Sequence, residues 1–169
     1  QRFIKKQRSE TVCFYDINLR PDCYSDKVIL TSLVYADLLK LNEQELEECK
    51  KLFRFSKSNN VFIPFLMNKF ALSAVAITKG DKGSELYTKD GCFHSKTYRV
   101  SSMVDTVGAG DAFSSVMILG ISRDWPLQLS LDRAQQFASA VVGQRGATVH
   151  DRRFYQPFAQ ASAAAPTAD

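Results

Sequence analysis

Short apolar runs along this chain end at polar or glycine-containing turns, and this pattern predicts buried strands. The runs at 11–15, 35–41 and 72–78 are rich in β-branched, aromatic or aliphatic residues, as strands are. Two later turns, 79–84 and 89–91, predict a hairpin that follows the third strand. Because the first two strands are each followed by a helical pattern, we expect an α/β fold with helices layered on a mostly parallel sheet.

The segments between and after these strands have apolar residues at helical spacing. The predicted helices are 27–33, 42–55, 112–120 and 129–142. Gly120 and Gly143 are expected to end the last two helices. Residues 61–70 form a less regular apolar segment that contains Pro64, and residues 159–169, rich in alanine, are expected to be a frayed tail.

The composition is that of a globular protein. The chain has 169 residues, of which 45% are hydrophobic and 24% charged, with a net charge of +4. No apolar run is long enough to cross a bilayer, so we expect no membrane partner and a cytoplasmic location. The modest charge, interleaved in sign, requires no nucleic acid.

Cysteine and histidine positions do not indicate a metal cluster. The four cysteines are scattered without paired spacing, and neither of the two histidines, His94 and His150, has a second ligand at metal spacing. Buried or partly buried thiols and structural or surface histidines are the expected interpretation. No P-loop string and no protein-kinase triplet occurs in the sequence.

The stretch at 105–113 carries the strongest chemical signal. Gly108 and Gly110 allow the backbone to approach an anion closely, and the helix that begins there offers unpaired N–H groups and the positive end of its dipole. Asp111 stands where a carboxylate could accept a proton from a hydroxyl. The alternative is a tight strand-to-helix connection in which Asp111 only stabilises the dipole.

Two further segments place polar groups directly after predicted strands. Alternation along an extended segment would put Asp16, Asn18 and Arg20 on one side, where Arg20 could hold a phosphate through two hydrogen bonds, although a solvated strand end is an equal alternative. Asn42, with Glu45 three residues later, has the form of a capping box, which needs no ligand.

The string at 105–113 resembles the C-terminal signature of the ribokinase-like (PfkB) carbohydrate kinases, Asp-Thr-x-Gly-Ala-Gly-Asp-x-Phe, at every fixed position. The resemblance implies a layered α/β/α ribokinase-like fold and ATP-dependent phosphorylation of a sugar hydroxyl. Asp111 would then be the base that contacts the sugar. The anion hole would be formed by Gly108, Ala109 and Gly110.

The same resemblance assigns roles to the other segments. In this family Thr-x-Gly-x-x-Gly lines the nucleotide phosphates, which adds a second interpretation to the hairpin turn, and Asn-x-x-Glu organises Mg²⁺ through water. A helix and turn near Gly146 form a wall of the adenine pocket, and the loop with Asp105 holds a monovalent cation such as K⁺. The residues implied in ATP or phosphate binding are Thr78, Gly80, Gly83, Asn42, Glu45, Arg20 and Gly146, with Arg20 also near the sugar.

The resemblance covers only the C-terminal half of such a kinase, with 1–158 as its ATP-binding and catalytic part. We find neither the glycine pair nor the lid strands by which family members grip a sugar. The Asp-x-Asn-Leu-Arg and Lys-x-Asn-x-x-Glu patterns are most similar to the fructokinase and ketodeoxygluconate kinase branches, which implies a ketose or a keto sugar acid. A nucleoside kinase, and a non-catalytic nucleotide-binding or scaffold protein, remain alternatives. A homodimer of the full-length protein is compatible with the resemblance.

Overall fold

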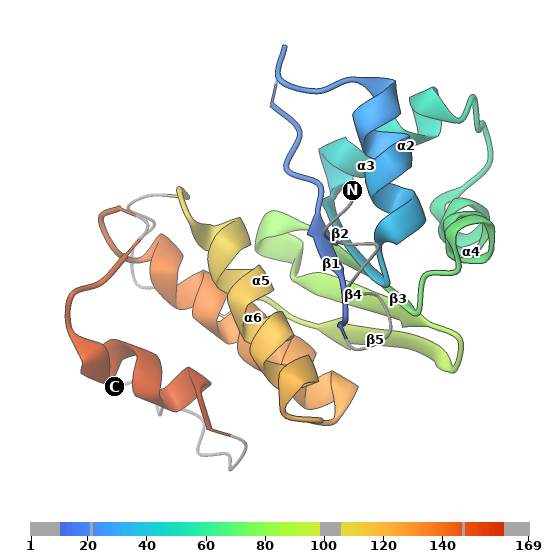
Figure 1. Ribbon diagram of the computed structural model, residues 1–169. Coiled ribbons are helices and arrows are strands. Elements are labelled where there is room, and N and C mark those ends of the chain that lie inside the picture. The colour runs from blue at the N-terminus through green and yellow to red at the C-terminus, as the bar shows by residue number, and fades with distance from the viewer. Residues whose placement is uncertain (1–10, 21, 99–105, 147, 161–169) are drawn as a thin grey trace. The chain divides into compact units, whose positions relative to one another are not determined.

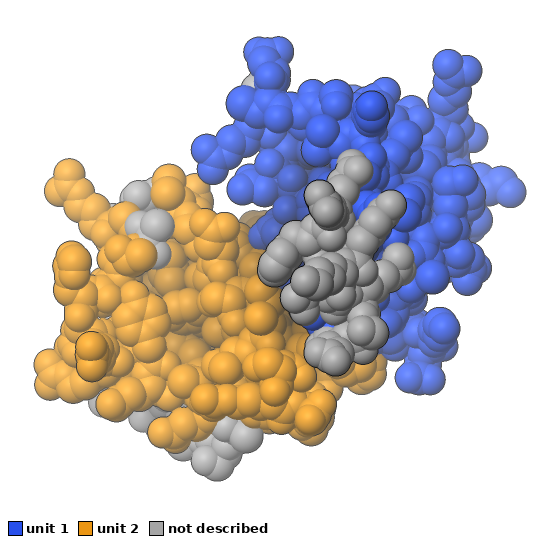
Figure 2. Space-filling model, in the orientation of Figure 1, with its two compact units in different colours: residues 1–79, 85–92 blue, residues 80–84, 93–169 orange. Residues whose placement is uncertain are grey.

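The computed structural model describes residues 11–20, 22–98, 106–146 and 148–160. The chain divides into two compact units, residues 1–79 with 85–92 (unit 1) and residues 80–84 with 93–169 (unit 2), shown in separate colours in Figure 2. The expected α/β class is confirmed, because helices and strands alternate through unit 1 and a five-stranded sheet runs in the order β1-β2-β3-β4-β5.

The strands and helices can be followed in Figure 1. The strands are β1 (Phe14–Asp16), β2 (Leu38–Asn42), β3 (Ala74–Thr78), β4 (Ser84–Thr88) and β5 (Gly91–Ser95). The helices are α2 (Asp26–Tyr35), α3 (Glu43–Leu52), α4 (Asn59–Phe70), α5 (Ala109–Ser122) and α6 (Leu127–Val142), with 3-10 turns η1 (Gly80–Lys82) and η2 (Arg152–Phe158).

The parallel part of the sheet consists of β1, β2 and β3. β1 pairs with β2 and β2 with β3, both in parallel. β4 and β5 are neighbours joined by a two-residue turn, and β4 follows β3 after only five residues, so these pairs are antiparallel, since a parallel connection needs a longer crossover. The sheet is therefore mixed, with the predicted hairpin at its end.

The core of unit 1 lies between these strands and helices α2, α3 and α4. Nearly every residue of β2 and β3 is buried, as expected for parallel strands covered on both faces. Helix α4 replaces the irregular segment expected at 61–70. Pro64 lies inside this helix, and the burial of Phe62, Ile63 and Leu66 stabilises a helix that lacks one backbone hydrogen bond.

Unit 2 contains the helical pair α5 and α6, which pack against each other. The expectation that Gly120 ends the first of these helices is wrong, because α5 continues to Ser122. Gly120 is instead a contact residue: a Cβ there would clash with the Ser130 side chain and lie 3.2 Å from Cε3 of Trp125. Gly143 does end α6, as predicted.

Candidate functional site

The carboxyl ends of β1, β2 and β3 bring several predicted site residues together in unit 1. Asp16 pairs in register with Lys40, and Asn42 pairs with Thr78. The Thr78 hydroxyl donates to the carbonyl of Leu41 at 3.4 Å. Ligands of open α/β sheets bind at this edge of the sheet, so the register itself places these side chains where a site is expected.

Lys40 is the lysine of the Lys-x-Asn-x-x-Glu pattern, and the sequence prediction assigned it no role of its own. It is only 5% exposed, yet it carries a charge, and its Nζ lies 3.1 and 3.2 Å from the two carboxylate oxygens of Asp16. A lysine within the apolar run Leu38–Leu41 was the available signal, because a buried lysine needs a charged partner. The ion pair fixes the Asp16 carboxylate at the end of β1.

Glu45 closes the capping box that the sequence predicted. The Asn42 side chain accepts a hydrogen bond from the Glu45 N–H at 2.8 Å, and Oε2 of Glu45 accepts one from the Asn42 N–H at 2.8 Å. The second carboxylate oxygen, Oε1, accepts from the N–H of Leu19 at 3.0 Å. Buried Glu45 therefore holds the loop that follows β1 as well as the start of α3.

The loop after β1 does not continue as an extended segment. Asn18 has φ of 40°, in the left-handed region, and Ile17 between it and Asp16 is buried. The expectation that Asp16, Asn18 and Arg20 line one side of an extended segment is therefore wrong, because the turn at Asn18 breaks the alternation. Arg20 is exposed after this turn.

The first turn of α5, in unit 2, contains the residues predicted to hold a phosphoryl group and a proton. Gly108 is the N-cap with φ of 84°, a conformation that glycine adopts without steric cost, and its carbonyl accepts from the N–H of Ala112 at 2.8 Å. Gly108 has no side chain to cap the helix, so backbone N–H groups at the helix start can face an anion. Asp111 lies in this turn with its side chain exposed.

The turn from Gly80 to Gly83 follows directly from β3. Gly80 and Gly83 have φ of 57° and 91°, and the N–H of Gly83 donates to the Gly80 carbonyl at 3.2 Å. A Cβ on Gly83 would clash with the carbonyl oxygen of Ser95 and lie 3.1 Å from Cα of Lys96, whereas one on Gly80 would meet nothing within 4 Å. Thr97 donates to the Gly80 carbonyl at 3.0 Å. The turn is thus compact and its backbone is tightly constrained.

An ion pair and a phenol hydroxyl group connect Lys79, before this turn, with strand β4 after it. Lys79 forms an ion pair with Glu85, and the hydroxyl of Tyr87 donates to Glu85 at 2.8 Å. Burial, together with the hydrogen bond to Glu85, raises the pKa of Tyr87, so the phenol stays protonated. The prediction did not single out Lys79 or Glu85, which link the residues before and after the glycine turn.

Two predicted positions complete the comparison with the sequence. Gly146 has φ of 84°, and a Cβ there would meet no atom within 4 Å, so it marks a turn after α6. Asp105, the predicted cation position, lies outside the described residues, as does the tail from 161 onward.

The described part of the chain contains no group of three or more metal-binding side chains and no helix long and apolar enough to span a membrane.

Comparison with known proteins settles the family. The model of the pfkB family carbohydrate kinases matches residues 2–152, most of the chain. The chain belongs to the pfkB family. Its residues Gly108, Gly110 and Asp111 lie at the start of helix α5.

Individual relatives of this pfkB protein share about a quarter of its sequence or less. It is 24% identical over 144 residues to a 5-dehydro-2-deoxygluconokinase of Bacillus anthracis, an alignment that covers 82% of this chain and 43% of the relative. A fructokinase of Xylella fastidiosa, solved with bound ATP, matches the fold with a TM-score of 0.75 and 20% identity over 86% of this chain and 50% of that one. A nucleoside kinase of Methanocaldococcus jannaschii matches with a TM-score of 0.72 and 24% identity over 86% and 46%.

The chain therefore has the ribokinase-like fold, and it spans about half the length of these relatives.

Proposed function

We propose that this pfkB protein contributes the catalytic and nucleotide-binding half of a kinase that transfers the γ-phosphoryl group of ATP to a sugar hydroxyl. One observation supports this most strongly: Gly108 in the left-handed conformation opens helix α5, and Asp111 stands exposed in its first turn. A carboxylate beside a helix N-terminus combines a proton acceptor with an anion site.

In the proposed reaction, the hydroxyl oxygen of the sugar attacks the γ-phosphorus as its proton passes to the carboxylate of Asp111. The bond between the γ-phosphorus and the bridging oxygen breaks, and ADP leaves. The backbone N–H groups of Ala109, Gly110 and Asp111 stabilise the charge on the transferring phosphoryl oxygens. Gly108 keeps the approach to these groups free of a side chain.

A second set of residues is proposed to bind the nucleotide. Thr78, Gly80 and Gly83 contact the phosphates through the turn after β3, and Gly146 belongs to the adenine wall. Arg20, exposed after the Asn18 turn, is the proposed additional phosphate and sugar contact.

The Glu45 carboxylate is compatible with Mg²⁺ binding through a bridging water molecule. Each Glu45 carboxylate oxygen accepts one N–H, from Asn42 or from Leu19, and a carboxylate offers about four acceptor positions, so capacity remains for a metal-bound water. Asn42 and Glu45 would hold the ion in this way, and K⁺ would bind near Asp105. When bound, Mg²⁺ neutralises phosphate charge.

The proposed acceptor is a ketose or a keto sugar acid. The relative from B. anthracis is named a 5-dehydro-2-deoxygluconokinase, and a fructokinase shares the fold. A nucleoside acceptor is the second candidate, because nucleoside kinases of M. jannaschii and Burkholderia thailandensis share the same fold.

The test is ATP consumption by the full-length parent with a panel of hexoses, keto sugar acids and nucleosides. We expect Asp111→Asn to lower kcat by about 10²–10⁴-fold with the fold retained. Asp26→Asn is the matched control, because Asp26 is also an exposed acid in the first turn of a helix but carries no proposed chemistry. Full turnover by Asp111→Asn would exclude Asp111 as the base.

The 169 residues alone should show weak or no turnover, because family members grip the sugar with residues from their other half. A turnover number for this chain equal to that of a complete kinase would contradict the expectation. Nucleotide binding without turnover in the full-length parent would favour the non-catalytic alternative.

A further inference from the structure

The loop that follows β1 is hydrogen-bonded on both sides of Arg20. The N–H of Leu19 donates to Oε1 of Glu45 at 3.0 Å, and the N–H of Cys23 donates to the Arg20 carbonyl at 3.1 Å. Surface loops are usually more mobile than the elements they connect. Here the backbone from which the Arg20 side chain extends is held by two hydrogen bonds within unit 1.

Neighbouring residues of this loop point in opposite directions. Leu19 packs against the buried core of unit 1, whereas Arg20 is exposed. The turn at Asn18, with φ of 40°, comes directly before them. Asparagine enters the left-handed region more readily than most residues that have a side chain, and a β-branched residue is strained there. The Asn18 turn and the bond to Glu45 therefore set the direction in which Arg20 leaves the loop.

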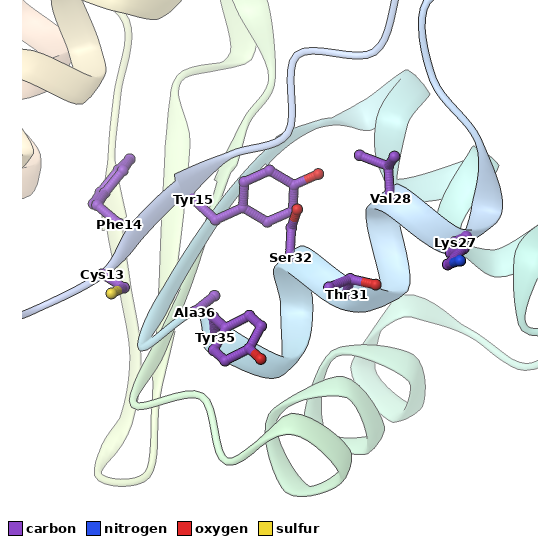
Figure 3. Close-up of a pocket in the computed structure, with 9 residues that line it drawn as sticks. All are labelled: Cys13, Phe14, Tyr15, Lys27, Val28, Thr31, Ser32, Tyr35 and Ala36. Atoms are coloured by element: carbon purple, nitrogen blue, oxygen red, sulfur yellow. The ribbon is translucent and has the colours of Figure 1, made fainter. Parts of the chain in front are cut away.

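The end of strand β1 is fixed by other contacts. Asp16 is ion-paired with buried Lys40 and continues the parallel pairing with β2. Tyr15 points toward α2, where its hydroxyl lies near that of Ser32 in the wall of the cavity between β1 and α2 (Figure 3). Neither contact involves Glu45. Glu45 consequently acts on the loop and not on the strand from which the loop starts.

We propose that Glu45 is a positioning residue for Arg20: by accepting the Leu19 N–H beside the Asn18 turn, it sets the place from which Arg20 reaches a phosphate. The inference rests on the proposed function, in which Arg20 contacts phosphate and Glu45 holds a metal-bound water, and it adds a coupling between the two. An arginine side chain loses conformational freedom when it binds, so a fixed backbone position lowers the cost of binding. Arg20 and Glu45 should then act as a coupled pair.

A double-mutant cycle in the full-length parent measures this coupling. The readout is the Kd of a non-hydrolysable ATP analogue with Mg²⁺, by calorimetry. Arg20→Gln alone should raise the Kd about tenfold, because it removes charge-assisted hydrogen bonds. In the Glu45→Ala background the same replacement should raise the Kd less than about twofold, whatever Glu45→Ala does to metal binding by itself.

Two residues with left-handed φ provide variants that leave the Glu45 carboxylate in place. Asn18 and Ala71, the C-cap of α4, are both exposed and have φ of 40° and 55°. Asn18→Val and Ala71→Val should lower the melting temperature by similar amounts, because both force a β-branched residue into this region. Only Asn18→Val should reduce the effect of Arg20→Gln to less than about twofold. Asn18→Gly, which adopts the turn without strain, should keep that effect near tenfold.

The results separate this inference from the proposed function. The coupling is refuted if Arg20→Gln raises the Kd equally in the wild-type, Glu45→Ala and Asn18→Val backgrounds, and the proposed nucleotide site stands in that case. It is also refuted if Ala71→Val reduces the Arg20 effect as much as Asn18→Val does, since a general loss of stability would then be the cause. Unchanged binding on Arg20→Gln in the wild-type parent would remove Arg20 as a phosphate contact and the coupling with it. A parent that does not bind the analogue would refute the proposed function itself.

Discussion

Replacement of Glu45 tests whether one carboxylate holds both the start of α3 and the loop after β1. Glu45 is 6% exposed, and its two oxygens accept hydrogen bonds from backbone N–H groups that lie far apart in the sequence, those of Asn42 and Leu19. Glu45→Ala removes both acceptors. Glu45→Gln keeps one acceptor oxygen for one of these N–H groups. Its NH₂ group faces the other N–H group and cannot accept a hydrogen bond from it.

The expected loss follows from these contacts. An N-terminal capping interaction contributes about 1 kcal/mol, and an unsatisfied buried donor costs about 1–3 kcal/mol. Glu45→Ala should therefore lower the free energy of unfolding by about 2–4 kcal/mol, and Glu45→Gln by about 1–3 kcal/mol. Because the Leu19 bond is lost or weakened, the amide of Leu19 should exchange faster in both variants.

Urea unfolding and amide exchange of the 169-residue chain measure the two effects. Glu47→Gln is the control on the same helix, since Glu47 is exposed and pairs with Lys50 at 3.2 Å in the geometry of a surface ion pair. It should cost less than about 0.5 kcal/mol and leave the Leu19 amide unchanged. The reasoning fails if Glu45→Gln is no more destabilising than Glu47→Gln, or if Leu19 exchanges at the wild-type rate in the Glu45 variants.

Two further predictions concern the glycine turn and the thiols. Gly83→Ala should destabilise the chain by at least about 2 kcal/mol in thermal unfolding and Gly80→Ala by about 1 kcal/mol, because both have positive φ but only a side chain on Gly83 clashes with Ser95; equal losses would refute the contact argument. Burial, followed by the nearby acidic residues, raises the pKa of Cys49 to about 12, so at pH 8 only about one thiol in 10⁴ is ionised and Cys49 should resist a thiol reagent that modifies exposed Cys23. The pKa of Cys49 is higher in the folded state than in the unfolded state. The stability that the neutral thiol contributes is therefore present below the unfolded pKa and declines as pH rises from about 9 toward 12. Rapid modification of Cys49 in the native protein at pH 8 would contradict its assignment as a buried thiol with a raised pKa.

Features that depend on neighbouring residues were predictable from the sequence. The capping box needs only Asn42 and Glu45 three residues apart, and the structure forms it as predicted. The end of α6 at Gly143 was likewise predictable, because the chain loses its helical pattern there. The glycine-containing string also indicated that a helix opens there, but α5 begins at Ala109 rather than at the predicted residue 112, with Gly108 as its N-cap at a positive φ that glycine adopts without cost.

Predictions failed where a distant contact overrides a local preference. Gly120 has the residue type of a helix terminus, but it allows Ser130 and Trp125 to approach, so the helix continues past it. The segment with Pro64 was expected to be irregular, yet burial of its apolar face on the core stabilises a helix there. Asn18 turns the chain where alternation predicted an extended segment.

The sequence by itself therefore determined the family and the α/β class, because a matching string of residues and short-range spacing are sufficient for each, and it supplied the residues that we propose for phosphoryl transfer. Only the tertiary structure decided which distant residues contact one another at the ends of the parallel strands. The pairing of Lys40 with Asp16 and of Glu45 with Leu19 joins residues on separate elements, more than twenty positions apart in the chain. Such pairs depend on strand register and on the packing of α3 against β2, which no local pattern encodes.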